Sequence, residues 1–203
     1  MKKAIFLDRD GVINEKAPEG DYVTRWQDLH VLPGVAEAIA EMKRAGFEVI
    51  VITNQRCVAK GLLTIAELEE LHRQMSDYLL QAGARIDAIY YCPHESEPVC
   101  RCRKPAPGML MDAAGERGIE LRTSWMIGDS CIDVEAGKNA GCKTVRIWTA
   151  SGDERLCDSA ASSPADVVAS SLRDAVAKIL ARENVAGSSG TAVAARSSVS
   201  GTH

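Results

Sequence analysis

The sequence has no long hydrophobic run and no strong excess of charge of one sign. Among its 203 residues, no apolar stretch approaches the roughly 20 residues that a membrane-spanning helix needs. The first residues lead into a short apolar stretch followed by acidic residues, which is unlike a cleaved signal peptide. The formal net charge of −4 gives no sign of a nucleic-acid-binding or membrane-binding surface. We therefore expect a cytoplasmic protein that binds neither nucleic acid nor membranes.

Internal repeats are also lacking, and the remaining composition is ordinary. The chain is 46% hydrophobic and 26% charged, which is typical of a soluble globular protein. Its length is enough for one well-buried core and too short for two comfortable domains. Because Gly, Ser, Ala, Thr and Val dominate beyond Glu183, we expect one domain over residues 1–182 and a disordered tail over 183–203. We expect a monomer, since no large exposed patch is evident.

Apolar runs alternate with segments of helical spacing along most of the chain. This pattern is typical of βαβ units, and it predicts an α/β fold with a Rossmann-like, doubly wound, mainly parallel sheet. The predicted strands are 4–7, 47–52, 86–91, 125–127, 143–148 and 166–168. The predicted helices are 34–46, 64–83, 107–117, 133–140 and 172–181.

The second predicted helix has the clearest local signals. Thr64 and Glu67 predict a capping box at its start. Its inward face is predicted from the helical spacing of Ile65, Leu68, Leu71, Met75 and Leu79. The isolated histidines His30 and His72 are interpreted as surface or helix-face residues.

Polar side chains follow the predicted strands: Asp8 and Asp10, Thr53, Lys104, and Asp129 with Asp133. Because the carboxyl ends of strands in a doubly wound sheet converge on one crevice, these side chains are expected to face one ligand. A phosphoryl group needs an anionic nucleophile, a divalent cation and donors for its oxygens. We expect Asp8 to be the nucleophile and Asp10 the acid and base. We expect Mg²⁺ on Asp8, Asp10 and Asp129, and phosphate on Thr53 and Lys104.

A second cluster of ligand types lies within eleven residues: Cys92, His94, Cys100 and Cys102. Three thiolates and one imidazole complete a tetrahedral zinc site with no open position, so we expect a structural Zn²⁺. The short loop leaves no room for a nucleic-acid recognition helix. Since the loop ends just before Arg103 and Lys104, we expect zinc to order both cationic side chains over the crevice.

Four motifs around these residues occur in order along residues 4–148, and together they resemble the haloacid dehalogenase (HAD) superfamily of phosphatases. They are Ile-Phe-Leu-Asp-Arg-Asp-Gly-Val at 5–12, Ile-Thr-Asn at 52–54, Arg-Lys-Pro at 103–105, and Ile-Gly-Asp at 127–129 with Asp133. A turn, a helix cap or a solvated lysine would explain any one of them, but four in register favour an enzyme. The resemblance implies a phosphomonoesterase with an aspartyl-phosphate intermediate.

Two further segments narrow the resemblance. Tyr-Tyr-Cys-Pro-His at 90–94 and Cys-Arg-Cys-Arg-Lys-Pro-Ala-Pro-Gly-Met at 100–109 look like the D-glycero-D-manno-heptose 1,7-bisphosphate 7-phosphatases. This likeness implies hydrolysis of the 7-phosphate to give the heptose 1-phosphate used for lipopolysaccharide or nucleotide-activated heptose, and a chain without a large cap domain. It also implies that substrate is contacted by Thr53, Asn54, Gln55, Arg103 and Lys104.

Two positions depart from the pattern of those enzymes. Arg56 and Cys57 stand where a small polar or acidic residue and then glycine are usual, and Ser130 stands where many relatives carry a basic residue. Arg56 is either a bidentate phosphate donor or an exposed loop arginine, and we count it among the candidate substrate-binding residues.

Three other functions stay open on the sequence alone. A histidinol-phosphate phosphatase would share every catalytic residue and the zinc loop. A polynucleotide 3′-phosphatase would need a basic groove, and the acidic composition of this chain gives no sign of one. A non-catalytic phosphate-binding protein would have no need of both Asp8 and Asp10.

Overall fold

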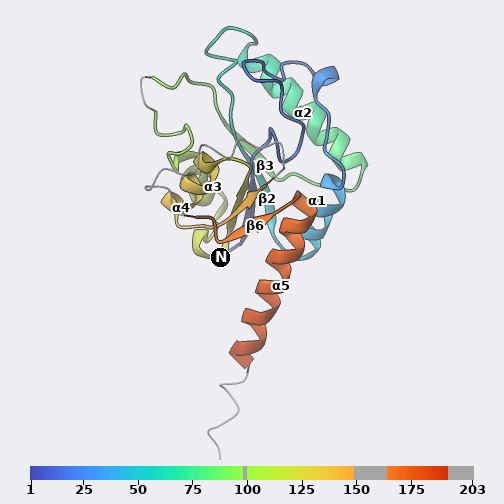
Figure 1. The fold of residues 1–203 in the computed structure, drawn as a ribbon, viewed down its shortest axis with the longest axis vertical. Helices are drawn as coiled ribbons and strands as arrows, with labels where there is room; N and C mark the ends of the chain where they lie inside the picture. Colours follow the sequence, from blue (N-terminus) through green and yellow to red (C-terminus); the bar gives the residue numbers. More distant parts are fainter. Residues whose placement is uncertain (98–99, 149–163, 192–203) are drawn as a thin grey trace, which may run out of the picture.

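A six-stranded parallel sheet forms the centre of the computed structural model, which describes residues 1–97, 100–148 and 164–191, with side chains as far as Val185. The strand order is β3-β2-β1-β4-β5-β6 (Figure 1). The strands are β1 (Ala4–Leu7), β2 (Glu48–Asn54), β3 (Ala88–Cys92), β4 (Trp125–Gly128), β5 (Lys143–Ile147) and β6 (Val167–Ala169). The helices are α1 (Val35–Arg44), α2 (Ile65–Gln81), α3 (Gly108–Arg117), α4 (Cys131–Ala140) and α5 (Leu172–Thr191), with 3-10 turns at η1 (Trp26–Asp28) and η2 (Leu121–Thr123). The predicted α/β class and parallel sheet are confirmed.

Helices cover both faces of the sheet, with α1 and α5 on one side and α3 and α4 on the other (Figure 1). Successive residues of β1 supply the two layers: Ile5 and Leu7 pack against α1, α2 and α5, whereas Ala4 and Phe6 pack against α3 and α4. Both faces of the strand are therefore buried. This explains why β1 is apolar at every position instead of alternating.

Helix α2 confirms most of its sequence signals and corrects one of them. The hydroxyl oxygen of Thr64 accepts from the Glu67 backbone at 3.2 Å, and the Glu67 carboxylate accepts from the Thr64 backbone at 2.7 Å, so the capping box is present. Ile65 was expected to face inward, but its position in the first turn leaves it 49% exposed. His72 was interpreted as a surface or helix-face residue, and the structure places it on the buried face of α2, where it is only 4% exposed.

Helix α5 extends beyond the predicted end near Ala181 to Thr191. Glu183, where the composition changes, is tied to the sheet by hydrogen bonds from Lys143 at 3.0 Å and from the Trp125 indole at 3.4 Å. These contacts keep the helix docked past the predicted boundary, and Figure 1 shows its end projecting away from the sheet. Residues 192–203 of the predicted tail lie outside the described residues.

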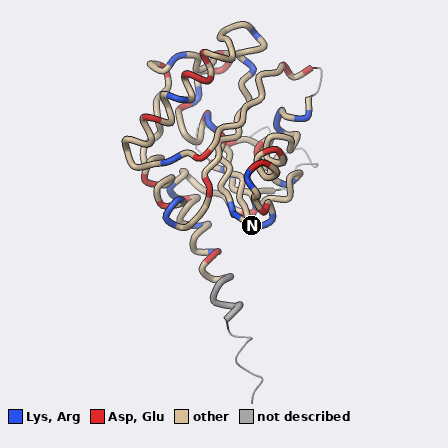
Figure 2. Tube along the Cα trace, turned by 180° about the vertical axis from the view of Figure 1, so that it is seen from behind, with Lys and Arg blue, Asp and Glu red and all other residues tan. Residues whose placement is uncertain are grey.

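Acidic and basic residues are interspersed along the described chain (Figure 2). In the part of the chain that the structure describes, no helix combines the length and apolarity needed to cross a membrane. The connections from β1 to α1 and from β2 to α2 are loops with only the short η1 turn in them, so the described elements include no separate cap domain.

Candidate active site

The central position of β1 places the first motif between two other strands. Leu7 is in register with Val51 of β2 and with Ile127 of β4. The Asp8 backbone N–H continues this pairing by donating to the Ile127 carbonyl at 3.0 Å. Residues that follow these three strands are therefore neighbours, as the sequence predicted.

Three carboxylates and one lysine meet at this edge of the sheet. Oxygens of Asp8, Asp129 and Asp133 lie within 4.8 Å of one another. The Lys104 ammonium lies 2.8 Å from Asp8 Oδ1 and 2.6 Å from Asp133 Oδ1, and it donates to the Ile52 carbonyl at 2.9 Å. Its side chain is 1% exposed. We name Asp8, Lys104, Asp129 and Asp133 the carboxylate cluster.

Burial and mutual repulsion shape the charges of this cluster. Burial raises the pKa of Asp8 to about 7; Lys104 opposes this effect, and the Asp133 and Asp129 carboxylates add to it. Burial also raises the pKa of Asp129, an effect that Lys16 opposes. For Lys104, burial alone would lower the pKa, but the carboxylates of Asp133 and Asp8 raise it above its ordinary value. Three acids thus share one buried cation, and a further cation would relieve their repulsion.

The cluster has the donor set of a magnesium site. Asp129 Oδ1 is buried and has no hydrogen-bond partner among the described residues, while Asp129 Oδ2 lies 2.5 Å from the Lys16 ammonium. Mg²⁺ prefers carboxylate oxygens and tolerates few of them because it keeps several waters. The residues present therefore fit the predicted ion, with Asp8 and Asp129 as its natural ligands.

Two glycines allow the chain to approach these carboxylates. Gly11 has a φ of +88°, and a Cβ atom built on it would lie 2.1 Å from Asp129 Oδ2. A Cβ atom on Gly128 would lie 2.1 Å from the Cβ of Asp133. Any side chain at either position would thus displace a carboxylate of the cluster.

Asp10 lies beside the cluster but is held by other groups. Its oxygens accept from the Arg9 guanidinium, from Asn14 at 2.9 Å and from Gln55 at 3.1 Å. Burial would raise the pKa of Asp10, but the charge of Arg9 and these hydrogen bonds lower it. The three carboxylates that lie close enough together to hold a metal ion are those of Asp8, Asp129 and Asp133, and Asp10 is not among them. Its role as a metal ligand stays a prediction.

The candidate substrate-binding residues occupy different positions around this edge. Thr53 is buried and accepts from Gln55 at 2.8 Å. Asn54 brackets the Lys104 backbone, because its oxygen accepts from the N–H at 3.0 Å and its amide donates to the carbonyl at 3.1 Å. Arg56 donates to Glu95 at 2.5 Å, so its guanidinium is engaged by the loop that follows β3. Arg103 donates to a backbone carbonyl of the same loop.

The four predicted zinc ligands converge at the end of β3, where Cys92 is the last strand residue and the other three lie in the loop that follows. Sulfurs of Cys92, Cys100 and Cys102 lie 3.3 to 3.5 Å apart, and His94 Nδ1 lies 3.2 Å from Cys102 Sγ and 3.6 Å from Cys92 Sγ. Zinc–sulfur bonds of about 2.3 Å in a tetrahedron would place the sulfurs about 3.8 Å apart. The cluster is consistent with a closed zinc site. Burial alone would raise the pKa of Cys100, but hydrogen bonding by Cys102 and its neighbours lowers it to about 6.

The zinc loop contacts Arg103 directly, whereas Lys104 is held by other residues. Arg103 Nη1 donates to the His94 carbonyl at 3.3 Å, so its position depends on the loop. Lys104 is instead held by Asp8, Asp133 and Asn54, which belong to the sheet edge and α4. We therefore expect zinc to order Arg103 rather than both residues.

Comparisons with known proteins agree with this geometry. Residues 101–175 match the HAD-hydrolase-like family. The chain is 37% identical over 155 residues to the D-glycero-beta-D-manno-heptose-1,7-bisphosphate 7-phosphatase of Pseudomonas aeruginosa, covering 76% of this chain and 86% of that one. It is 44% identical over 147 residues to the enzyme of Rhodopseudomonas palustris, covering 69% and 80%.

A solved structure gives the same answer for the fold. The D,D-heptose 1,7-bisphosphate phosphatase of Bordetella bronchiseptica, complexed with magnesium and phosphate, is similar with a TM-score of 0.79 and 34% identity, covering 89% of this chain and 99% of that one. The chain belongs to the heptose 1,7-bisphosphate 7-phosphatase family of HAD-type phosphatases. Its enzyme class, a phosphoric monoester hydrolase, is the one that the four motifs predicted.

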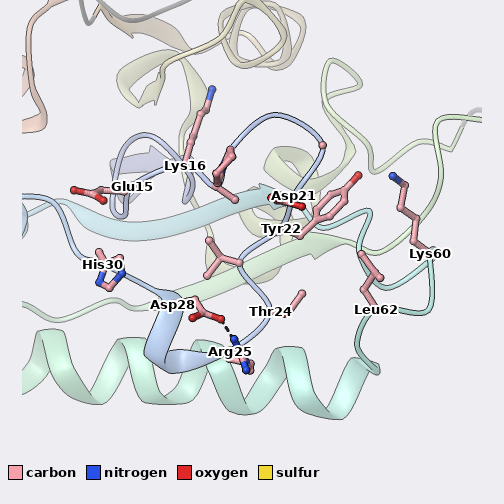
Figure 3. Close-up of a pocket in the computed structure, with 14 residues that line it drawn as sticks. Glu15, Lys16, Asp21, Tyr22, Thr24, Arg25, Asp28, His30, Lys60 and Leu62 are labelled. Atoms are coloured by element: carbon pink, nitrogen blue, oxygen red, sulfur yellow. Dashed lines mark hydrogen bonds and ion pairs between the residues drawn. The ribbon is translucent and has the colours of Figure 1, made fainter.

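Within this family member, the loop after β1 forms a wall of a cavity of about 1120 Å³. Lys60 lies over the Tyr22 ring at 4.9 Å, and Arg25 is paired with Asp28 (Figure 3). Lys16 belongs to the same loop and points away from Arg25 and Asp28 (Figure 3). Its ammonium pairs with Asp129. The cavity thus adjoins the carboxylate cluster through Lys16.

Sequence reasoning gave no separate role to two residues of this site. Asp133 is fully buried, and besides pairing with Lys104 it accepts from the Ser130 N–H at 3.1 Å and from the Ser130 hydroxyl at the start of α4. Ser130 thus caps the start of α4. His72 contacts Arg9, with 3.2 Å between His72 Nε2 and Arg9 Nη1. Its spacing from Leu68 and Met75 was the signal that could have placed it on the buried face of α2.

Proposed function

We propose that this protein removes the 7-phosphate of D-glycero-D-manno-heptose 1,7-bisphosphate in a Mg²⁺-dependent reaction. The observation that carries the proposal is the carboxylate cluster, in which Asp8 lies 2.8 Å from a buried lysine and beside an Asp129 oxygen that has no hydrogen-bond partner among the described residues. This arrangement offers a nucleophile, a phosphate-binding cation and a metal-binding oxygen at one point. The names of the similar phosphatases supply the substrate.

The first step forms a bond between an Asp8 oxygen and phosphorus and breaks the bond from phosphorus to the sugar oxygen. Asp10 gives its proton to that leaving oxygen. The pKa of Asp10 is lowered in the free protein. The incoming phosphate dianion places negative charge nearby and favours the protonated form that this step requires. Bound Mg²⁺ screens the negative charges that otherwise repel one another.

The second step hydrolyses the aspartyl phosphate. Ionised Asp10 takes a proton from water, the water oxygen bonds to phosphorus, and the bond from Asp8 to phosphorus breaks. Inorganic phosphate leaves and both aspartates return to their starting forms. Lys104 stays charged throughout because its pKa is raised, and its charge offsets that of the non-bridging oxygens in both steps.

Substrate selection is assigned to the loops around the sheet edge. Asn54 orients Lys104 through its backbone, and Gln55 links Thr53 to Asp10. Arg103 is the candidate for binding the part of the substrate that lies away from the reacting phosphate. Arg56 is paired with Glu95, so a role in binding phosphate requires that pair to open. The cytoplasmic location and monomeric state expected from the sequence belong to this proposal, and light scattering of the purified chain tests the latter.

The deciding experiment measures Mg²⁺-dependent phosphate release from heptose 1,7-bisphosphate and from histidinol phosphate, with Asp8→Asn as the blank. The expected result is a clear preference for the bisphosphate that is lost in Asp8→Asn. Preference for histidinol phosphate would contradict the substrate and retain the chemistry. Release that persists in Asp8→Asn would contradict the nucleophile.

A further inference from the structure

Arg9 stands between the two motif aspartates, yet its side chain turns inward and is 1% exposed. Nη2 donates to both Asp10 oxygens, at 3.1 and 3.0 Å, and Nε lies 3.3 Å from Oδ1. The remaining nitrogen, Nη1, lies 3.2 Å from Nε2 of His72. The guanidinium therefore joins the proposed acid–base carboxylate to a helix that is distant in sequence.

The chemistry of this contact defines the state of His72. A guanidinium has donors and no acceptor, so Arg9 donates and Nε2 of the imidazole accepts. The ring is consequently neutral, with its proton on Nδ1. Burial, followed by the charge of Arg9, lowers the pKa of His72 to about 3, which agrees with this assignment. The His72 ring also packs against Tyr91 of β3, with centroids 5.7 Å apart.

We propose that His72 is a positioning residue for the phosphatase reaction: it anchors Arg9, and Arg9 holds the Asp10 carboxylate in its working orientation. The inference rests on the proposed acid–base role of Asp10. His72 itself touches no reacting atom.

The remaining contacts explain why this anchor matters. Asp10 also accepts from Asn14 and Gln55, which restrain the carboxylate from its other sides. Without an acceptor at position 72, a buried donor of Arg9 would be left without a partner, and the guanidinium would move to find one. Because Arg9 grips both Asp10 oxygens, the carboxylate would turn with it. Small misplacements of a catalytic group lower turnover far more than they lower substrate binding.

The test compares His72→Leu, which removes the acceptor, with His72→Gln, whose side-chain oxygen can accept from Arg9. With saturating Mg²⁺, we expect kcat of His72→Leu to fall by about ten- to a hundredfold. KM should change by less than about twofold, because the groups that bind substrate are untouched. His72→Gln should recover most of kcat. Leu79→Ala, on the buried face of the same helix, is the control for lost stability.

Equal loss of kcat in His72→Leu, His72→Gln and Leu79→Ala, at matched loss of thermal stability, would overturn the inference. So would an unchanged kcat in His72→Leu. A readout without turnover keeps it separate from the proposed function: ¹⁵N NMR of the Arg9 guanidinium should show slow rotation in the wild type and His72→Gln and lose it in His72→Leu. A wild type that hydrolyses neither the bisphosphate nor an aryl phosphate would overturn the proposed function, and the NMR result would still decide the position of Arg9.

Discussion

The carboxylate cluster stands at the ends of paired strands and on α4, whereas the cysteine and histidine ligands lie at the last residue of β3 and on the one loop that follows it. In the carboxylate cluster, Lys104 already neutralises part of the charge and bonds to a strand carbonyl. In the zinc loop, the described side-chain contacts of the four ligands are mainly with one another. The carboxylate cluster is thus preformed by the fold, and we expect the zinc loop to depend on its metal for order. The following predictions test this difference, from the largest expected effect to the smallest.

Lys104→Met should give the largest loss of stability. It leaves Asp8 and Asp133 buried without their cation, and removing one partner of a buried ion pair costs about 3–5 kcal/mol. Urea unfolding measures the free energy. Mg²⁺ should restore part of the loss, because a divalent ion supplies charge at the same carboxylates. A variant as stable as the wild type would show that the cluster is not preformed by Lys104.

Because His72 is buried beside Arg9, the stability of the folded protein should fall at acidic pH. Burial and Arg9 lower the pKa of His72 from 6.5 to about 3. The unfolded chain therefore binds a proton near pH 6.5 that the folded protein does not bind until near pH 3. Stability from neutral His72 is complete above pH 6.5 and is lost as the pH falls, at about 1.4 kcal/mol per pH unit.

Urea unfolding of the wild type and His72→Gln at several pH values between 6.5 and 4.5 measures this contribution. Between pH 6.5 and pH 4.5 we expect the wild type to lose about 2–3 kcal/mol of stability relative to His72→Gln. Other acids titrate equally in both proteins and cancel. Parallel pH profiles would mean that His72 is not buried in its neutral form.

Zinc removal should loosen the loop and leave the sheet intact. Cys100→Ser or chelation should raise hydrogen exchange in residues 92–102 without raising it in β1. Loss of order at Arg103 should lower kcat/KM by about tenfold. Cys142→Ala, which changes a buried cysteine outside the loop, is the matched control. Unchanged kcat/KM in the zinc-free protein would contradict the role of the loop, and increased exchange in β1 would break the comparison.

Lys16 should have the smallest effect. Its ammonium pairs with Asp129 while its side chain is 54% exposed, so the pair contributes only about 0.2–1 kcal/mol. Lys16→Met should slightly destabilise the metal-free protein and tighten Mg²⁺ binding by up to about fivefold, because a competing cation is removed. Isothermal titration calorimetry measures the affinity. Weaker Mg²⁺ binding in Lys16→Met would show that the lysine assists the ion instead of competing with it.

Residues at strand ends could be predicted from sequence because one local rule places them. The apolar runs locate the strands, and the parallel topology then brings Asp8 and Asp129 together across more than a hundred residues. The zinc ligands were predictable for a similar reason, since all four lie in one short segment.

Pairs between separate loops could not be predicted, because no local pattern contains them. Arg56 with Glu95 and Lys16 with Asp129 depend on how two irregular segments lie in space. His72 shows a third situation. Its helical spacing with Leu68 and Met75 marked it as buried, but its polar character argued for the surface, and only the buried Arg9 resolves that conflict.

The position of β1 in the strand order has a consequence for synthesis. Its two neighbours are β2 and β4, and Ile5 pairs with Trp125 on one of these edges. A growing chain that has left the ribosome only as far as β3 holds β1 by one edge and leaves its other edge unpaired. An apolar strand in that state is a site for aggregation. The exposed edge of β1 is therefore covered only once residues 125–128 have been made and have paired with it.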